Sequence, residues 1–189
     1  MANILPLRAV LRNGETVLIR EIGPADRPQM QDGFAKLSSQ SRLFRFLAPH
    51  KELSEAELDH FTEPNSDTHF AIGAASTGVD TEMPIATARF IRAAPDAPEA
   101  EFAITIIDSH QRLGLGGLLL RTLARAAVER GVERFTALLH SENTAMQALM
   151  RAFGGRRQGA GQEEHWVLPL PLKPEPTLSR QPSEVAIWT

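Results

Sequence analysis

The 189-residue sequence predicts an α/β (α+β) fold: a mixed, mostly antiparallel sheet of about six or seven strands with helices on both faces. One observation is a strand-like segment at 99–108 that leads through glycines into a helical segment at 115–130, with another strand-like segment at 134–139. A crossover through a helix returns the chain in the same direction, so this unit predicts one parallel pair. The other observation is two apolar segments, 69–75 and 85–93, joined by a polar stretch, which predicts an antiparallel hairpin.

The remaining elements follow from local patterns. Alternation after the Asn13–Gly14 turn predicts a strand, and helical spacing predicts two helices. A capping box that starts at Ser54 predicts a third helix. The C-terminal part adds a helix and a last strand. In chain order, these elements are predicted at 16–21, 26–37, 41–47, 54–61, 144–153 and 165–168.

The helix at 115–130 carries an apolar stripe that predicts its buried face. Gly131 follows at the position where a glycine commonly ends a helix. The stripe consists of Leu115, Leu119, Leu123, Ala126 and Ala127.

Length and composition predict one domain at 1–170 and a Pro-rich C-terminal tail at 171–189. From Pro169 onward, five prolines in fourteen residues favour an extended chain. The apolar segment Val185–Trp188 could still pack on the domain or on a partner, so a homodimer stays open.

The composition also limits the function. A net charge of −3 and a pI near 6.1 give no sign of nucleic-acid binding. Because the chain has no cysteine and its six histidines are scattered, we expect no metal site. No apolar run has membrane-spanning length, and the N-terminal residues lack the pattern of a signal peptide, so we expect no membrane contact and a cytoplasmic location.

The glycine-rich run before the long helix predicts an anion site. The first N–H groups of a helix have no intrahelical acceptor and lie at the positive end of its dipole, and glycine lets a ligand approach the backbone. A P-loop would need a Lys and a Ser or Thr after the glycines, and a dinucleotide fingerprint would need glycine at Leu119. The run contains Gln111, Arg112, Leu113, Gly114, Leu115, Gly116 and Gly117.

The spacing Q-x-x-G-x-G resembles the acyl-CoA loop of the GNAT acyltransferase superfamily. Downstream, 142–154 resembles the family's N-x-x-[AM]-x-x-L-x-x-x-x-G pattern. The resemblance runs from about Gly14 to Leu168 and implies a GNAT-like fold with acetyl-CoA as cosubstrate and no metal. Asn143 has a second interpretation, as a helix N-cap that needs no ligand. Beyond the loop, the cofactor-binding residues that the resemblance implies are Ile106, Ile107, Asp108, Asn143 and Met146.

Further matches point to one subfamily. The segment 19–26 resembles the opening of bacterial GNAT domains. The segments 38–46, through its S-x-x-S-R-x-x-R-F pattern, and 131–135 resemble the bacterial Pat-type protein lysine acetyltransferases. This resemblance implies a protein lysine as the acceptor amine. We expect the helices between Asp26 and Phe61 to shape the acceptor site.

Glu101 is the predicted general base. Its surroundings resemble the family's A-E-[IVF]-[AV]-[FI] strand, whose glutamate takes the proton from the lysine amine. On a strand, Glu101 shares a face with Ala103 and Thr105 and lies about 16 Å from Ile106, a suitable length for a pantetheine arm. The alternative is a solvated residue at a strand end beside Glu99.

The general acid is open. Many enzymes of the family protonate the leaving thiolate with a tyrosine, and this chain has none. His140, Ser141 or water could replace it, and the residues do not decide between them. Two further hypotheses therefore stay open: a small-molecule amine acetyltransferase, and a non-catalytic acyl-CoA-binding sensor module.

Overall fold

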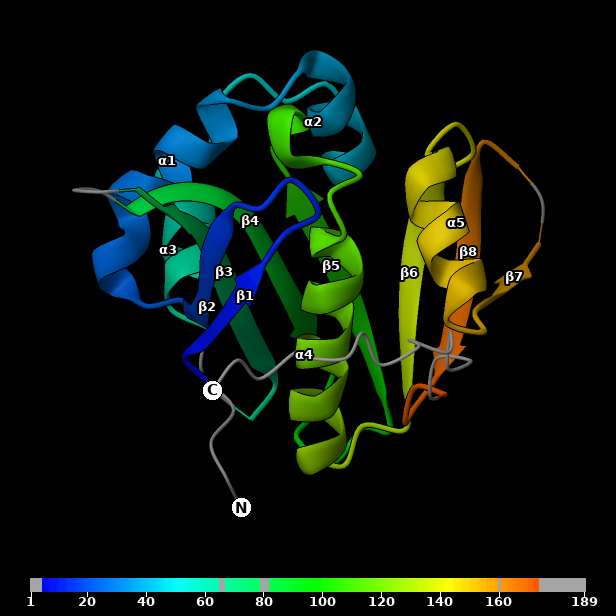
Figure 1. Cartoon of the computed structure of the whole chain (residues 1–189). Helices are drawn as coiled ribbons and strands as arrows, with labels where there is room; N and C mark the ends of the chain where they lie inside the picture. Colours follow the sequence, from blue (N-terminus) through cyan, green and yellow to red (C-terminus); the bar gives the residue numbers. More distant parts are fainter. Residues whose placement is uncertain (1–4, 65–66, 79–81, 160, 174–189) are drawn as a thin grey trace, which may run out of the picture.

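The computed structural model describes residues 5–64, 67–78, 82–159 and 161–173, and its helices and strands agree closely with the predicted order (Figure 1). The strands are β1 (Leu7–Val10), β2 (Thr16–Glu21), β3 (His69–Thr77), β4 (Glu82–Ile91), β5 (Glu99–Ile106), β6 (Arg134–His140), β7 (Arg156–Gln158) and β8 (Glu163–Pro169). The α-helices are α1 (Arg27–Ala35), α2 (Ser39–Phe46), α3 (Glu55–Thr62), α4 (Leu115–Glu129) and α5 (Thr144–Ala152). Two 3₁₀ turns, Pro24–Asp26 and Asp108–His110, precede α1 and α4.

The eight strands form one sheet in the order β1-β2-β3-β4-β5-β6-β8-β7. Every neighbouring pair is antiparallel except β5 and β6, which confirms the mixed sheet and its parallel unit. The expected six or seven strands become eight because β1 and β7 add short edge strands. β7 is three exposed polar residues, a composition that gives no strand signal.

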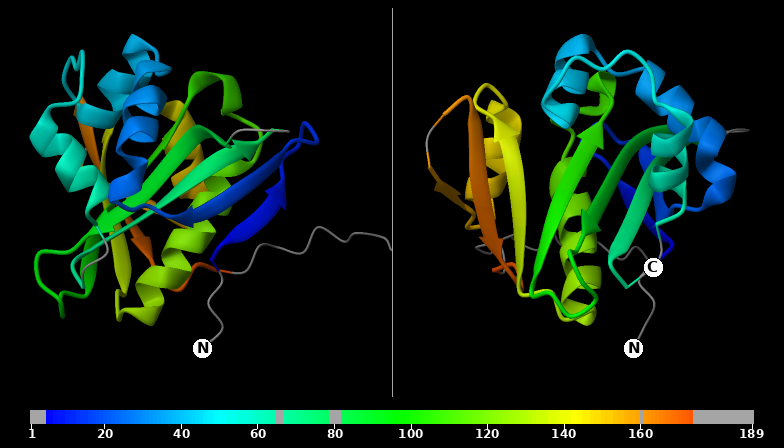
Figure 2. Two further views of the ribbon diagram at one scale, coloured as in Figure 1. Left: turned by 90° about the vertical axis from the view of Figure 1, so that its left-hand side faces the viewer. Right: turned by 180° about the vertical axis from the view of Figure 1, so that it is seen from behind.

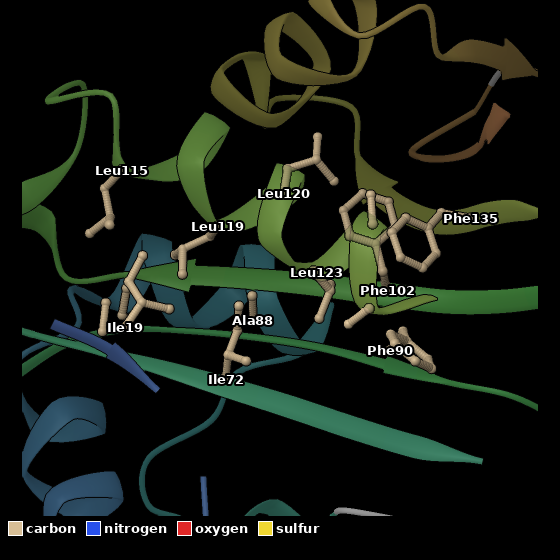
Figure 3. Packing of buried hydrophobic residues seen from close by; sticks show 14 of the residues in the cluster. Ile19, Ile72, Ala88, Phe90, Phe102, Leu115, Leu119, Leu120, Leu123 and Phe135 are labelled. Carbon is tan, nitrogen blue, oxygen red and sulfur yellow. The ribbon is translucent and has the colours of Figure 1, made fainter. Parts of the chain in front are cut away.

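Helices cover both faces of the sheet, as predicted. α4 and α5 lie on one face, and α1, α2 and α3 lie on the other (Figures 1 and 2). On the α4 face, the predicted stripe is buried against alternate residues of the central strands (Figure 3). Leu119 and Leu123 have no exposed surface, and they face Ile72, Ala88 and Phe90. The other residues of β4 and β5, which alternate with these, therefore face α1–α3.

The described chain continues to Lys173, three residues past the predicted end of the domain at 170. Leu170 donates its N–H to the carbonyl of Glu133 at 2.8 Å, and Leu172 packs against the core. The rest of the predicted tail, with Val185–Trp188, lies outside the described residues. Within the described ranges, no helix is both long and apolar enough to cross a bilayer.

Arg20 and Asp26 of the 19–26 segment form a structural ion pair. The guanidinium donates to both carboxylate oxygens at 2.7 and 2.9 Å, and the N–H of Gly23 donates to the same carboxylate at 2.8 Å. Burial raises the pKa of Asp26, but these hydrogen bonds outweigh burial and hold the pKa below its ordinary value. The ion pair therefore holds the end of β2 against the start of α1.

We expect Asp26→Asn to lower the free energy of unfolding by about 1–3 kcal/mol, because Arg20 loses its charged acceptor. The pKa of Asp26 is lower in the folded state than in the unfolded state. The ion pair therefore contributes its full stabilisation above the pKa of the unfolded state, and this stabilisation is lost as the pH falls through the pKa of the folded state. Urea denaturation should show the difference between variant and wild type at pH 7 and its decline below about pH 4. The exposed neighbour Glu21→Gln should change stability by less than about 0.5 kcal/mol. An Asp26→Asn protein as stable as wild type at pH 7 would contradict this assignment.

Candidate functional site

The parallel pair β5–β6 ends after three residues. Glu99, Ala100 and Glu101 pair with Arg134, Phe135 and Thr136, and beyond this point the two strands diverge (Figure 1). β5 stays with β4, and β6 stays with β8 along its whole length. The Ile107 N–H donates to the carbonyl of Ile85 on β4. Because the backbone N–H and C=O groups of successive residues point to opposite edges of a strand, those of Ile104 and Ile106 point away from β4, toward the side where β5 and β6 diverge.

The glycine-rich loop lies where β5 leads into α4, and its backbone has two positive φ angles and a series of unpaired N–H groups. Arg112 and Gly114 have φ angles of 62° and 91°, and only glycine adopts the second without strain. In the described part of the chain, no N–H group from Arg112 to Gly117 donates to a protein acceptor. Unpaired N–H donors at the start of a helix are the groups that an anion site requires.

Gly116 and Gly117 place the loop beside β5 and α5. A Cβ at Gly116 would lie 3.6 Å from both Ile106 and Leu149, and one at Gly117 would lie 3.7 Å from the Phe153 ring. These are ordinary contact distances, so an alanine would fit. The start of α4 therefore lies between the two halves of the sheet.

Arg12, in the turn between β1 and β2, is a cation that the sequence did not point to. Its N–H donates to the carbonyl of Leu113 at 3.2 Å, and its Nε lies 3.7 Å from the position of a Cβ at Gly114. An arginine before a hairpin turn carries no sequence signal for a ligand. The fold brings it beside the loop, where it adds a positive charge to that of Arg112.

Asp108 and Gln111 join the loop to α2. The Asp108 carboxylate accepts hydrogen bonds from the N–H and Oγ of Ser38 and from the Oγ of Ser41, at 2.8–3.0 Å. Burial raises its pKa, but the bonds from Ser38 and Ser41 outweigh this and lower the pKa. Gln111 donates to the carbonyl of Ile106 at 3.1 Å and to Ser41 Oγ at 3.3 Å. Both side chains thus hold the site together.

The remaining predicted cofactor residues divide into two groups. Ile106 is half-buried beside Gly116, whereas Ile107 is buried and uses its N–H within the sheet. Asn143 caps α5, because its Oδ1 accepts from the Met146 N–H at 3.1 Å. Met146 is half-buried against the core. The cap interpretation of Asn143 is therefore confirmed, and its side-chain amide NH₂ has no protein acceptor among the described residues.

Glu101 is exposed and lies at the point where β5 and β6 separate. Its strand position turns it to the face covered by α1–α3. Burial lowers the pKa of Arg45 on α2, and the Glu101 carboxylate acts in the opposite direction, so the two side chains are electrostatic neighbours. Glu99, two residues earlier, is instead paired with Arg134.

His140 and Ser141 lie at the end of β6. The His140 ring centroid is 5.5 Å from that of Phe44 on α2, which brings the two halves of the molecule together above the diverging strands. His140 Nδ1 accepts from the Glu142 N–H at 3.2 Å, so a neutral ring carries its proton on Nε2. Ser141 donates its backbone N–H to the carbonyl of Gln162.

A pocket of about 520 Å³ lies between α1–α3 and the sheet. Phe34, Phe46 and Phe61 line its helical side, and Thr87 and Thr105 line its sheet side. Arg45 and Arg89 are the two arginines of the lining. The acceptor site was expected at these helices. Arg89 was not among the expected residues, although an arginine inside an apolar strand was the available signal. Among the described residues, no three His, Asp or Glu side chains are grouped to hold a metal ion.

Comparison with known proteins gives consistent matches. The family model described as acetyltransferase (GNAT) domain matches residues 16–156. Acetyltransferase Pat of Mycolicibacterium smegmatis is 32% identical over 81% of this chain, and the chain spans only 45% of that protein's length. Acetyltransferase PA5475 of Pseudomonas aeruginosa is 32% identical over a region that covers 76% of this chain and 77% of that protein's length.

Solved structures agree with these matches. The GNAT domain of S. lividans PAT superposes with a TM-score of 0.80 and 28% identity, covering 87% of this chain and 96% of its own. A cAMP-binding acyltransferase from Mycobacterium smegmatis superposes with a TM-score of 0.64 and 25% identity, covering 94% of this chain and 50% of its own.

Proposed function

Because the chain belongs to the GNAT acetyltransferase family, we propose that it transfers an acetyl group from acetyl-CoA to a protein lysine, with Glu101 as general base. One arrangement carries the proposal: the unpaired N–H groups at the start of α4 lie beside the strands that diverge after Glu101. The lysine acceptor rests on the resemblance to Pat-type enzymes. The cytoplasmic location and a homodimer are further parts of the proposal.

The loop would bind the pyrophosphate. The N–H groups from Arg112 to Gly117 supply donors, and the guanidiniums of Arg112 and Arg12 supply charge. The backbone groups of Ile104 and Ile106 that face the diverging side would pair with the pantetheine amides. This positions the thioester on β5, between the loop and Glu101.

In the reaction, the amine nitrogen attacks the thioester carbonyl and passes its proton to Glu101, directly or through water. The C–N bond forms, the C–S bond breaks, and the electron pair leaves on sulfur. A backbone N–H of β5 on the diverging side would donate to the oxyanion. With no tyrosine in the chain, water or His140 Nε2 would protonate the thiolate.

A thermal-shift panel with acetyl-CoA, CoA, ATP and NAD tests the cosubstrate. Acetyl-CoA or CoA at about 100 times its Kd should stabilise the protein by about 2.7 kcal/mol, and ATP and NAD should not. Release of CoA thiol with lysine peptides and with small amines then tests the acceptor. Stabilisation without turnover on any amine would favour the acyl-CoA sensor, and no stabilisation by either CoA compound would contradict the proposal.

A further inference from the structure

Two arginines meet in the pocket beneath α1–α3. Arg89 of β4 is 3% exposed; its guanidinium lies 4.2 Å from the Phe61 ring centroid, and its Nη1 lies 3.4 Å from His69 Nε2. Arg45 of α2 lies against the same Phe61 ring, at 5.7 Å. Within the described ranges, no carboxylate lies within ion-pair distance of either guanidinium.

Arg89 therefore has no carboxylate partner in the described part of this pocket, whereas the Glu101 carboxylate is an electrostatic neighbour of Arg45. Burial, together with the nearby Arg45 cation, lowers the pKa of Arg89 to about 9, so Arg89 is still charged at pH 7. Burial and the neighbouring Arg89 lower the pKa of His69 to about 4, so that ring is neutral and accepts from Arg89 rather than neutralising it. A buried cation without a counter-ion is costly, and an anionic ligand group would remove that cost.

The rest of the lining suits a short acyl chain with a polar end. Thr87 and Thr105 are direct cross-strand partners, and in the described structure neither hydroxyl has a protein partner. Aromatic and aliphatic side chains cover the other side.

The position of the pocket favours the acyl group over the acceptor. Thr105, Ile107 and Arg89 line the pocket, and Glu101 does not. Arg89 is the direct cross-strand partner of Ala103, which lies between the loop and Glu101, where the thioester would lie. Paired strands lie about 5 Å apart, so a short acyl chain that begins at the thioester beside Ala103 would extend toward the Arg89 side chain.

We propose that the enzyme also accepts an acyl-CoA whose short chain ends in a carboxylate, a succinyl-type thioester, and that Arg89 and Arg45 bind that carboxylate. This inference rests on the proposed acyl transfer. The step is unchanged: the amine forms the new C–N bond, CoA leaves as the thiol, and the product amide keeps its free carboxylate.

The test compares succinyl-CoA with butyryl-CoA, which has the same four-carbon chain without the charge. The readout is the ratio of the two kcat/KM values, supported by calorimetric Kd values. Wild type should prefer succinyl-CoA, and Arg89→Met should lower that ratio by about 10- to 100-fold, the effect of charge-assisted hydrogen bonds. Arg89→Lys should retain part of the preference. If Arg89→Met does not fold, Arg45→Met, at a half-buried helix position, should show the same selective loss.

Several results would overturn the inference. One is a wild type that uses butyryl-CoA as well as succinyl-CoA; another is a variant that loses both equally. A third is an arginine variant that loses acetyl transfer to lysine but keeps acetyl transfer to cadaverine, which is lysine without its carboxylate. That result would mean that the arginines bind a carboxylate of the acceptor and not of the acyl group. In each case acetyl-CoA still binds and reacts, whereas failure of the proposed function would abolish turnover with all three acyl-CoA compounds.

Discussion

Glu101→Gln should lower kcat by about 10²–10⁴-fold on the true acceptor, while the affinity for acetyl-CoA stays nearly unchanged. Glutamine keeps the size of the side chain and much of its hydrogen bonding, but it cannot take the proton from the attacking amine. The residual rate should rise with pH, because solvent then deprotonates a larger fraction of the acceptor. Steady-state kinetics from pH 6 to 9, together with calorimetry for acetyl-CoA, measures both effects.

Glu99→Gln is the matched control for this experiment. Glu99 is an exposed glutamate on the same strand, but it is paired with Arg134 rather than placed beside Arg45. Its substitution should change kcat by less than about threefold, an effect typical of a surface site. Near-native turnover by Glu101→Gln at neutral pH would remove Glu101 from the role of base.

The second large effect is expected at the loop, where Gly116→Asp should weaken acetyl-CoA binding by roughly 100-fold or more. The new side chain would start beside Ile106 and Leu149, at the start of α4 where we propose that the pyrophosphate binds, and like charges brought together cost several kcal/mol. Gly114→Asp should act in the same direction. Its φ of 91° adds backbone strain, so Gly116 gives the clearer test.

Gly116→Ala separates charge from bulk. A Cβ at this position makes only ordinary contacts at 3.6 Å, so the alanine variant should fold and bind acetyl-CoA within about threefold of wild type. Isothermal titration of the three proteins, with melting temperatures recorded, gives the comparison. Normal binding by Gly116→Asp would place the acetyl-CoA site elsewhere.

Much of the fold was predictable because its signals are local. The buried stripe of α4, the glycine that ends it and the Ser54 capping box each involve neighbouring residues, and each is observed. The loop is local too, since its unpaired N–H groups follow from a strand that turns through glycines into a helix. The short edge strands β1 and β7 were missed because they owe their conformation to their strand partners.

The candidate site divides in the same way. The sequence alone determined the loop residues, the Asn143 cap and the identity of the strand that carries Glu101, since each depends on periodicity, capping or backbone conformation within a few residues. The tertiary structure decided the rest: where β5 and β6 separate, which side chain holds Ser38 seventy residues away, and that Arg45 and Arg89 share one pocket without a described carboxylate partner. These features depend on strand pairing and burial between residues far apart in the sequence. The free-energy cost of a buried charge is set by whether the fold places a partner beside it.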